Sequence, residues 1–262
     1  MLNFGRPQNR RVDTPSVWRR RGLAWAAAVG VTVALAGTLA AVSWLQDPQH
    51  LPIREVRING ELRHLSPVHV QQAVLAEATG GFFSVDVDRI RAAVLGDPWV
   101  REVSVRRVWP DTLVVTVSEQ HPLAYWGTAA LISAEGAVFR PAPEQFPAGL
   151  PLLTGPEGAQ MTLLNRYRQL QAWFAPLGLS VQQVDLNPRR SWRFTVVNEQ
   201  AGGGMSVAIE VVVGRADFDA RVQRLITAWP RTVGVRENDI ASVDLRYTNG
   251  FAVRLRRAPP LG

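Results

Sequence analysis

The 262-residue chain contains no cysteine and no lysine. Without cysteine, disulfide bonds, thiolate metal sites and cysteine nucleophiles are excluded. Without lysine, a phosphate-binding Gly-x-x-x-x-Gly-Lys loop is excluded. The sequence also lacks a Gly-x-Ser-x-Gly nucleophile turn and a His-Glu-x-x-His metal motif, and its four histidines are scattered. We therefore expect a protein that is not an enzyme and has no catalytic, cofactor-binding or metal-binding residues.

Charge is missing altogether from Gly22–Leu45, a run of 24 consecutive residues. About 20 apolar residues in a helix span the ~30 Å hydrocarbon core of a bilayer. The run therefore predicts one transmembrane helix. Basic and aromatic side chains favour the edges of a membrane, which predicts interface anchors at Arg19, Arg20, Arg21, Trp25 and Trp44.

The distribution of charge predicts the orientation of this helix. Residues 1–21 carry six arginines and one acid, whereas residues 46–262 carry 23 arginines and 21 acids. The positive-inside rule places residues 1–21 in the cytoplasm and the remainder in the periplasm, as a single-pass protein of the inner membrane. Because most of the excess charge lies in the tail, the exterior part has no basic face of the kind that binds nucleic acid.

A cleaved signal peptide is the competing interpretation, with Ala41 and Ser43 as small residues near a cleavage site. Its apolar region is normally about 7–15 residues long. The observed run is longer, which favours an uncleaved anchor. The arginines at 19–21 also suggest a twin-arginine signal, but Gly22 and Leu23 do not supply its usual hydrophobic context.

The pattern after the anchor predicts an α+β fold that begins with a β-α-α-β-β unit. Ser66 and Pro67 are typical of a helix start, and Gly96 is typical of a helix end. The predicted elements are a strand at 53–58, a helix at 67–78, a helix from Asp86 or Asp88 to Gly96, and a hairpin of 103–106 with 113–118. We expect Trp99 and Trp109 to fill the core of this unit or the end of its hairpin.

The rest of the chain predicts a β-rich region with flanking helices. Five prolines indicate an irregular loop at 141–158, and Gly202–Gly204 is typical of a hairpin tip. The predicted elements are a strand at 124–126, a hairpin of 131–132 with 138–139, helices at 161–175 and 217–229, strands at 181–186, 192–197 and 207–213, and a final hairpin of 242–247 with 251–255 around an Asn249–Gly250 turn.

Several polar groups invite a chemical interpretation, and each has a simpler one. We expect His64 and His69 to be ordinary solvated histidines. Asp86 with Asp88, and Asp217 with Asp219, lie at predicted helix starts, where acids favour the positive end of the helix dipole. The stretch Arg189–Arg193 predicts a solvated strand face, with a partner surface or an anion site as alternatives.

The ordered set of motifs resembles the bacterial FtsQ/DivIB family of cell-division proteins. The resemblance rests on the stretches 99–113, 125–126, 152–158, 189–192, 214–215 and 243–247. It implies a POTRA domain at 51–120 and a β-domain at 121–257. These follow a cytoplasmic tail at 1–21 and the helix at 22–45, and precede a C-terminal tail at 258–262.

The resemblance also implies a function. The protein would be a non-enzymatic scaffold of the divisome at the division septum, linking early division proteins to the FtsB–FtsL pair and to septal peptidoglycan synthesis. An edge strand can take up an extended segment of a partner. The family positions that receive FtsB match Arg246, Tyr247, Asn249, Gly250, Phe251 and Val253, with Asn249 in place of a small hydroxyl residue.

Three alternatives stay open at this point. Tyr247 and Phe251 could simply pack within the final sheet. The protein could be a membrane-anchored periplasmic hydrolase of the cell wall, which would require a pocket that brings a nucleophile and a base together. It could also be an export factor that carries a POTRA domain, although no series of barrel strands follows here.

Overall fold

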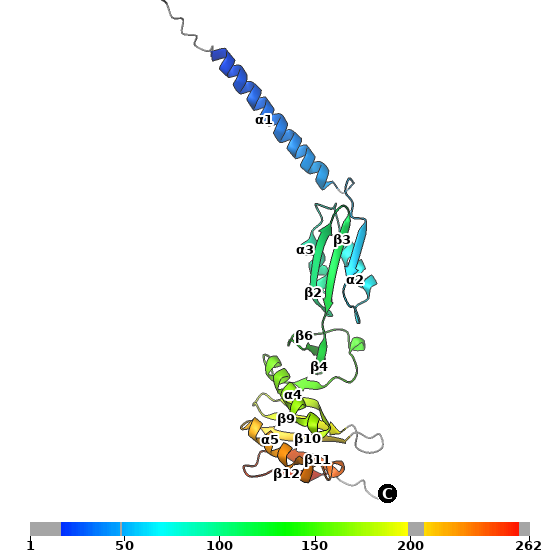
Figure 1. The fold of residues 1–262 in the computed structure, drawn as a ribbon, viewed down its shortest axis with the longest axis vertical. Helices are drawn as coiled ribbons and strands as arrows, with labels where there is room; N and C mark the ends of the chain where they lie inside the picture. The colour runs from blue at the N-terminus through cyan, green and yellow to red at the C-terminus, as the bar shows by residue number, and fades with distance from the viewer. Residues whose placement is uncertain (1–16, 48, 199–206, 257–262) are drawn as a thin grey trace, which may run out of the picture.

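A computed structural model describes residues 17–47, 49–198 and 207–256. The molecule is elongated (Figure 1). A long helix leads to a small unit with a three-stranded sheet, and this is followed by a larger unit with a nine-stranded sheet. We call the part from β1 to β3 the proximal unit and the part from β4 to β12 the distal unit. The predicted hairpin tip at Gly202–Gly204 lies outside the described residues.

The first helix, α1, spans Val17–Gln46 and includes the predicted anchor. Its apolar stretch Trp25–Leu45 has 21 residues and a mean hydropathy of 1.9. At 1.5 Å per residue such a stretch is about 30 Å long, which matches a hydrocarbon core. The structure thus confirms one long apolar helix among the described residues, near the start of the chain, with Trp25 and Trp44 exposed close to the two ends of its apolar stretch.

The proximal unit has the predicted β-α-α-β-β order. Its sheet has the order β1-β3-β2, in which β1 is parallel to β3 and β2 is antiparallel to it. The elements are β1 (Glu55–Asn59), α2 (Pro67–Glu77), α3 (Val87–Leu95), β2 (Val100–Val108) and β3 (Thr112–Glu119). Trp99 is buried in the core of this unit, whereas Trp109 is exposed at the end of the hairpin.

Local capping explains where some of the helices begin, although not all of them. The Asp86 carboxylate accepts hydrogen bonds from the backbone N–H groups of Asp88 and Arg89, at 3.0 and 3.1 Å, so this acid caps α3 as predicted. Ser66 occupies the cap position of α2 but its side chain makes no capping hydrogen bond. Asp217 likewise occupies the cap position of α5, with a left-handed backbone (φ 55°), and its side chain makes no capping hydrogen bond.

The distal unit is built on a sheet of order β12-β11-β10-β9-β8-β7-β4-β5-β6. The apolar sides of α4 (Gln160–Phe174) and α5 (Phe218–Ala228) pack on this sheet in one core. The strands are β4 (Pro122–Trp126), β5 (Ala130–Ser133), β6 (Val138–Phe139), β7 (Leu152–Thr154), β8 (Leu179–Leu186), β9 (Trp192–Asn198), β10 (Val207–Gly214), β11 (Ile240–Asp244) and β12 (Ala252–Leu255).

The region 141–158 is not wholly irregular, which corrects the prediction. It contains a short 3-10 helix, Pro143–Gln145, and the strand β7. β7 pairs in parallel with β4 on one side and β8 on the other, and Leu153 is fully buried. Three residues between prolines are too few to show an alternating pattern, so only the pairing with distant strands identifies this segment.

Candidate functional site

The last strand, β12, forms one edge of the nine-stranded sheet. Among the described strands it pairs only with β11, in antiparallel register. An edge strand carries backbone N–H and C=O groups that are free to pair with another chain. The structure therefore identifies the open edge on the C-terminal side of the sheet (Figure 1).

The apolar side chains of β12 continue a buried row of β11. Val253 lies opposite Val243, and Leu255 lies opposite Ile240. Residues directly opposite on paired strands share one face of the sheet. Val243 and Ile240 are buried in the distal core, whereas Val253 is 41% exposed and Leu255 is 55% exposed. The core-facing row thus ends in two uncovered apolar side chains at the edge.

The connection before β12 differs from the predicted hairpin. β11 ends at Asp244 and β12 begins at Ala252, so residues 245–251 form a loop and not a two-residue turn. A type I′ turn requires a positive φ at both central residues. Neither Asn249 nor Gly250 has one. The predicted strand at 242–247 with an Asn–Gly turn was therefore wrong beyond Asp244.

An ion pair at the end of β11 explains why the strand stops there. The Asp244 carboxylate accepts hydrogen bonds from the backbone N–H of Arg246 at 3.0 Å and from its guanidinium at 2.6 to 3.0 Å. The hydrogen bonds from the Arg246 side chain hold the pKa of Asp244 below its ordinary value despite partial burial. This local bonding turns the chain away from an extended path.

The predicted partner-binding residues thus fall into two groups. Arg246, Tyr247 and Asn249 are exposed on the loop, and Tyr247 is 58% exposed. The Tyr247 carbonyl accepts a hydrogen bond from Arg224 of α5, which ties the loop to that helix. Phe251 is half-buried and packs against the distal core. The alternative that both aromatic residues simply pack in the sheet therefore fits Phe251 but not Tyr247.

The far end of β12 is held by an arginine. Arg256 donates from its backbone N–H to the carbonyl of Asp239 at 2.7 Å and from Nε to the carbonyl of Ile240 at 3.1 Å. Its guanidinium also donates to the carbonyl of Ala208. These contacts fix the short strand against its neighbours, so the edge is a defined surface.

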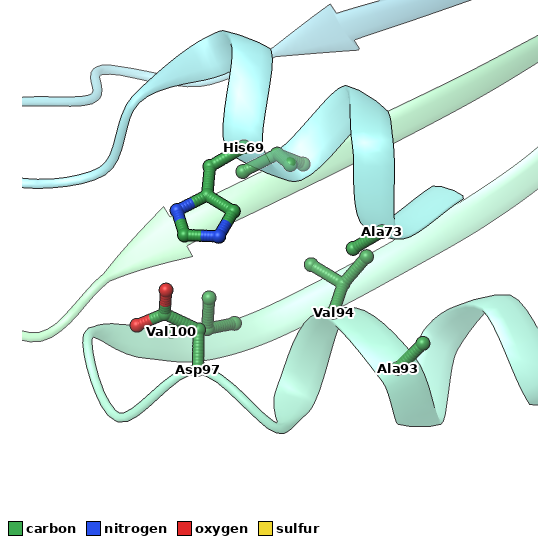
Figure 2. Close-up of a pocket in the computed structure, with 7 residues that line it drawn as sticks. His69, Ala73, Ala93, Val94, Asp97 and Val100 are labelled. Atoms are coloured by element: carbon green, nitrogen blue, oxygen red, sulfur yellow. The ribbon is translucent and has the colours of Figure 1, made fainter. Parts of the chain in front are cut away.

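A small depression lies between α2 and α3 of the proximal unit, with a volume of about 240 Å³. Figure 2 shows His69 and Ala73 on one side and Val94 on the other, with Asp97 below the imidazole ring. The Asp97 carboxylate accepts a hydrogen bond from the backbone N–H of Trp99 at 2.9 Å. The Asp97 carboxylate thus stabilises a turn. Because most of the other residues that line the depression are apolar, we assign no chemical role to it.

The basic stretch at 189–193 is divided between a turn and a strand. Arg190 has a positive φ of 60° in the β8–β9 turn, and Trp192 is buried. Arg193 lies on the face of β9, with Nη1 3.1 Å from Oε1 of Glu210 on β10. Arg190 and Trp192 line a wider depression of about 740 Å³ together with Arg215. The predicted solvated strand face thus describes Arg193 alone.

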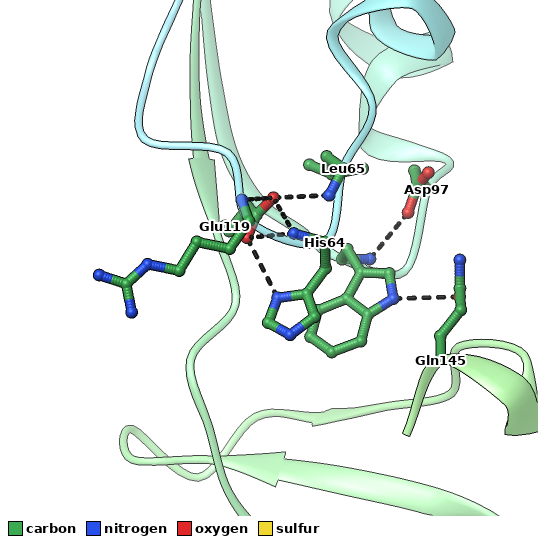
Figure 3. A network of polar contacts seen from close by, with 7 residues as sticks. His64, Leu65, Asp97, Glu119 and Gln145 are labelled. Carbon is green, nitrogen blue, oxygen red and sulfur yellow. Dashed lines mark hydrogen bonds and ion pairs between the residues drawn. The ribbon is translucent and has the colours of Figure 1, made fainter. Parts of the chain in front are cut away.

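His64 is exposed, as expected of a solvated histidine, but its ring also has two specific partners. Its ring stacks on Trp99 with centroids 4.0 Å apart, and its Nδ1 lies 3.3 Å from Oε2 of Glu119 (Figure 3). The two partners are distant in sequence, so no local pattern could have indicated them. His69 is likewise exposed, as expected.

This cluster lies where the two units meet. The buried Glu119 carboxylate accepts from the backbone N–H groups of Arg63, His64 and Leu65 at 2.9, 3.0 and 2.7 Å. Trp99 Nε1 donates to Oε1 of Gln145 in the distal unit at 3.1 Å. Side chains of the distal strands β5 and β6, namely Leu131 and Phe139, are part of the proximal core. The two units therefore share packing and not merely a linker.

The titratable groups of the chain do not gather into a metal site within residues 17–47, 49–198 and 207–256, where no three His, Asp or Glu side chains are placed to hold an ion. Asp219, one of the acids at a predicted helix start, lies 2.6 Å from Nη1 of Arg166 through its Oδ1. The β12 edge is thus the feature of the described structure best suited to a partner.

Comparison with known proteins identifies both units. Residues 51–120 match the family described as POTRA domain, FtsQ-type, and residues 124–246 match Cell division protein FtsQ/DivIB, C-terminal. The chain is 39% identical over 211 residues to Cell division protein FtsQ of Burkholderia pseudomallei (strain K96243), covering 80% of this chain and 82% of that protein.

Other relatives show the same extent of similarity. The chain is 35% identical over 245 residues to Cell division protein FtsQ of Bordetella pertussis, covering 88% of this chain and 90% of the relative. It is 32% identical over 222 residues to the protein of the same name from Coxiella burnetii, covering 85% and 88%. With its single apolar helix, POTRA domain and β-rich unit, the chain belongs to the FtsQ/DivIB family of membrane-anchored cell division proteins.

Proposed function

We propose that this chain is a non-enzymatic scaffold of the divisome whose β12 edge takes up an extended segment of the FtsB subunit of an FtsB–FtsL pair. In this role the protein links early division proteins to septal peptidoglycan synthesis. Residues 1–21 lie in the cytoplasm, and the domains at 51–120 and 121–257 lie in the periplasm at the division septum. Arg19, Arg20, Arg21, Trp25 and Trp44 anchor the helix at the two membrane interfaces.

The observation that carries the proposal is the exposed apolar row on a strand that is paired along one side only. A partner strand beside β12 would pair with its free backbone groups and would cover Val253 and Leu255. Backbone pairing supplies affinity, while the side chains on the covered face supply specificity. The exposed Tyr247 lies on the loop at the start of this edge and extends the surface.

The charges around the edge favour a defined register. Arg254 follows Val253 within β12, Arg246 lies on the loop that leads to this strand, and both are exposed. Asp244 holds Arg246 in place, so one cation is fixed beside the end of β11. Charged groups at the rim of an interface guide approach and register more than they add affinity.

The absence of cysteine allows a direct test by cross-linking. Single cysteines are placed at 252, 253, 254 and 255 in the full-length chain and are paired with a cysteine scan of full-length FtsB, co-expressed with FtsL. Side chains of a strand alternate with a period of two. If FtsB adds a strand to β12, moving the cysteine by two residues along β12 should therefore shift the FtsB position that forms the disulfide by two residues as well. Val235→Cys, on an exposed apolar residue outside β12, is the control.

Two results would contradict the proposal. One is cross-linking at position 235 as efficient as that at positions 252–255. The other is cross-linking at the edge with no alternating register, which would indicate contact without strand pairing.

A further inference from the structure

The end of the proximal unit nearest α1 carries exposed apolar side chains. Phe83 lies in the loop before α3, and Val108 and Trp109 lie at the β2–β3 turn. Trp109 is 74% exposed and Phe83 is 48% exposed. The Arg107 guanidinium donates to the carbonyl of Val85 at 2.6 Å, which holds the two loops together. We call residues 81–85 and 108–111 the proximal tip.

The chain turns back on itself directly after the membrane-spanning helix. The backbone N–H of His50 donates to the carbonyl of Asp47 at 3.1 Å. The His50 ring lies 4.7 Å from the ring of Trp44, measured between centroids. Leu51 is six positions after Leu45 along the chain, a span of at most about 20 Å when fully extended. Because of the turn, Leu51 lies closer than that to the end of the helix.

Hydrogen bonds continue from this turn into the proximal tip. The backbone N–H of Phe82 donates to the carbonyl of Leu51 at 2.8 Å, and that of Arg54 donates to the carbonyl of Asp111 at 2.9 Å. Both loops of the tip are therefore bonded to residues within ten positions of the apolar span. Figure 1 shows the same arrangement, with the β2–β3 turn beside the end of α1.

We propose that the proximal tip rests in the headgroup layer of the bilayer that α1 crosses, with Trp109 and Phe83 in contact with lipid. Each headgroup layer is about 5–8 Å thick beyond the hydrocarbon core, within reach of a tip held this close to Leu45. Aromatic side chains favour this layer, because the ring is apolar while the surroundings remain wet. The contact would add a second attachment beside the helix and would set the tilt of both units against the membrane.

The chemistry of the tip selects the kind of lipid surface. The exposed residues Phe83, Val108, Trp109 and Pro110 carry no charge, and the charged residues beside them are of both signs, namely Arg54, Asp86, Arg107 and Asp111. Attraction to anionic lipid requires a basic cluster. The contact therefore depends on aromatic insertion and should form on a zwitterionic bilayer.

The test uses the full-length chain, one copy per nanodisc of phosphatidylcholine. A single cysteine replaces Trp109 or, as the control, Val235, which is 72% exposed in the distal unit and so matches Trp109 in exposure. Each cysteine carries the same environment-sensitive fluorophore, and quenching by aqueous iodide is measured. We expect a quenching constant at position 109 at least about fivefold lower than at position 235, since a headgroup-embedded probe is shielded from water.

A second variant separates insertion from folding. Phe83→Asp in the Trp109→Cys chain should bring the quenching constant to within about twofold of the control, because a charge at the interface opposes insertion. Circular dichroism confirms that both chains fold. Equal quenching at positions 109 and 235 without Phe83→Asp would overturn the proposal. Shielding that appears only with several copies per disc would also overturn it and would assign the tip to self-association.

Discussion

The imidazole of His64 lies flat on the indole of Trp99, with ring centroids 4.0 Å apart and ring planes 2° from parallel. His64 comes from the loop between β1 and α2, and Trp99 immediately precedes β2. The indole N–H is bonded to Gln145 of the distal unit. One aromatic stack thus connects the loop, the proximal core and the neighbouring unit, which gives the junction a fixed geometry.

Trp99→Ala should lower the free energy of unfolding by about 3–5 kcal/mol, the usual cost of removing a large buried aromatic side chain. Urea unfolding followed by circular dichroism measures the loss. Trp109→Ala is the matched control, because this tryptophan is exposed, and it should change stability by less than about 0.5 kcal/mol. Similar losses for the two variants would contradict the buried role of Trp99.

Glu119→Ala should destabilise the junction, because three backbone N–H groups would lose their acceptor. A buried donor left without a partner costs about 1–3 kcal/mol. Hydrogen exchange at the backbone N–H groups of Arg63, His64 and Leu65 should accelerate. This local change distinguishes loss of these hydrogen bonds from a general loss of stability. Glu119→Gln keeps one acceptor oxygen and should have a smaller effect. Unchanged exchange in Glu119→Ala would show that these bonds do not hold the loop.

The ion pair of Asp244 and Arg246 should make the free energy of unfolding depend on pH. The hydrogen bonds from Arg246 depress the pKa of Asp244 in the folded state below its unfolded value. The stabilisation is therefore present at pH values above the pKa of Asp244 in the unfolded state. It is lost as the pH falls through the pKa of Asp244 in the folded state. Because Arg246 is exposed, screening by solvent keeps this contribution to the free energy of unfolding small.

Asp244→Asn provides the comparison for this pH dependence. Its free energy of unfolding should be below that of the natural chain near neutral pH, and the difference should shrink as the pH is lowered. Urea unfolding of both chains at about pH 7 and about pH 3 measures it. A difference that grows on acidification would refute the assigned sign.

Tyr247→Asp should weaken capture of FtsB–FtsL in pull-downs with the full-length chain, because a charge replaces an exposed aromatic ring beside the proposed edge. Its thermal unfolding should change little, since Tyr247 is exposed. Val235→Asp adds the same charge elsewhere and should leave capture intact. Phe251→Asp is a poorer test, because Phe251 packs against the distal core and its loss would also destabilise the fold. Undiminished capture by Tyr247→Asp would remove this residue from the partner surface.

Part of the proposed site was predictable from the sequence. The alternating pattern that placed Val253 on a strand holds, because β12 spans Ala252–Leu255. The same reasoning extended the preceding strand to Tyr247, which the structure places on a loop. Asn–Gly is a strong turn signal only when the strands on both sides reach it. Here the hydrogen bonds between Asp244 and Arg246 end β11 first.

The sequence alone determined the apolar helix, the β-α-α-β-β order of the proximal unit and the cap at Asp86, because each depends on residues within a few positions of one another. Only the tertiary structure decided that Leu152–Thr154 is a central strand, that β12 is an open edge and that His64, Trp99 and Glu119 meet at the junction. These features arise from pairing and packing between segments far apart in the chain. Such contacts produce no periodic pattern within either segment, so the local sequence does not predict them.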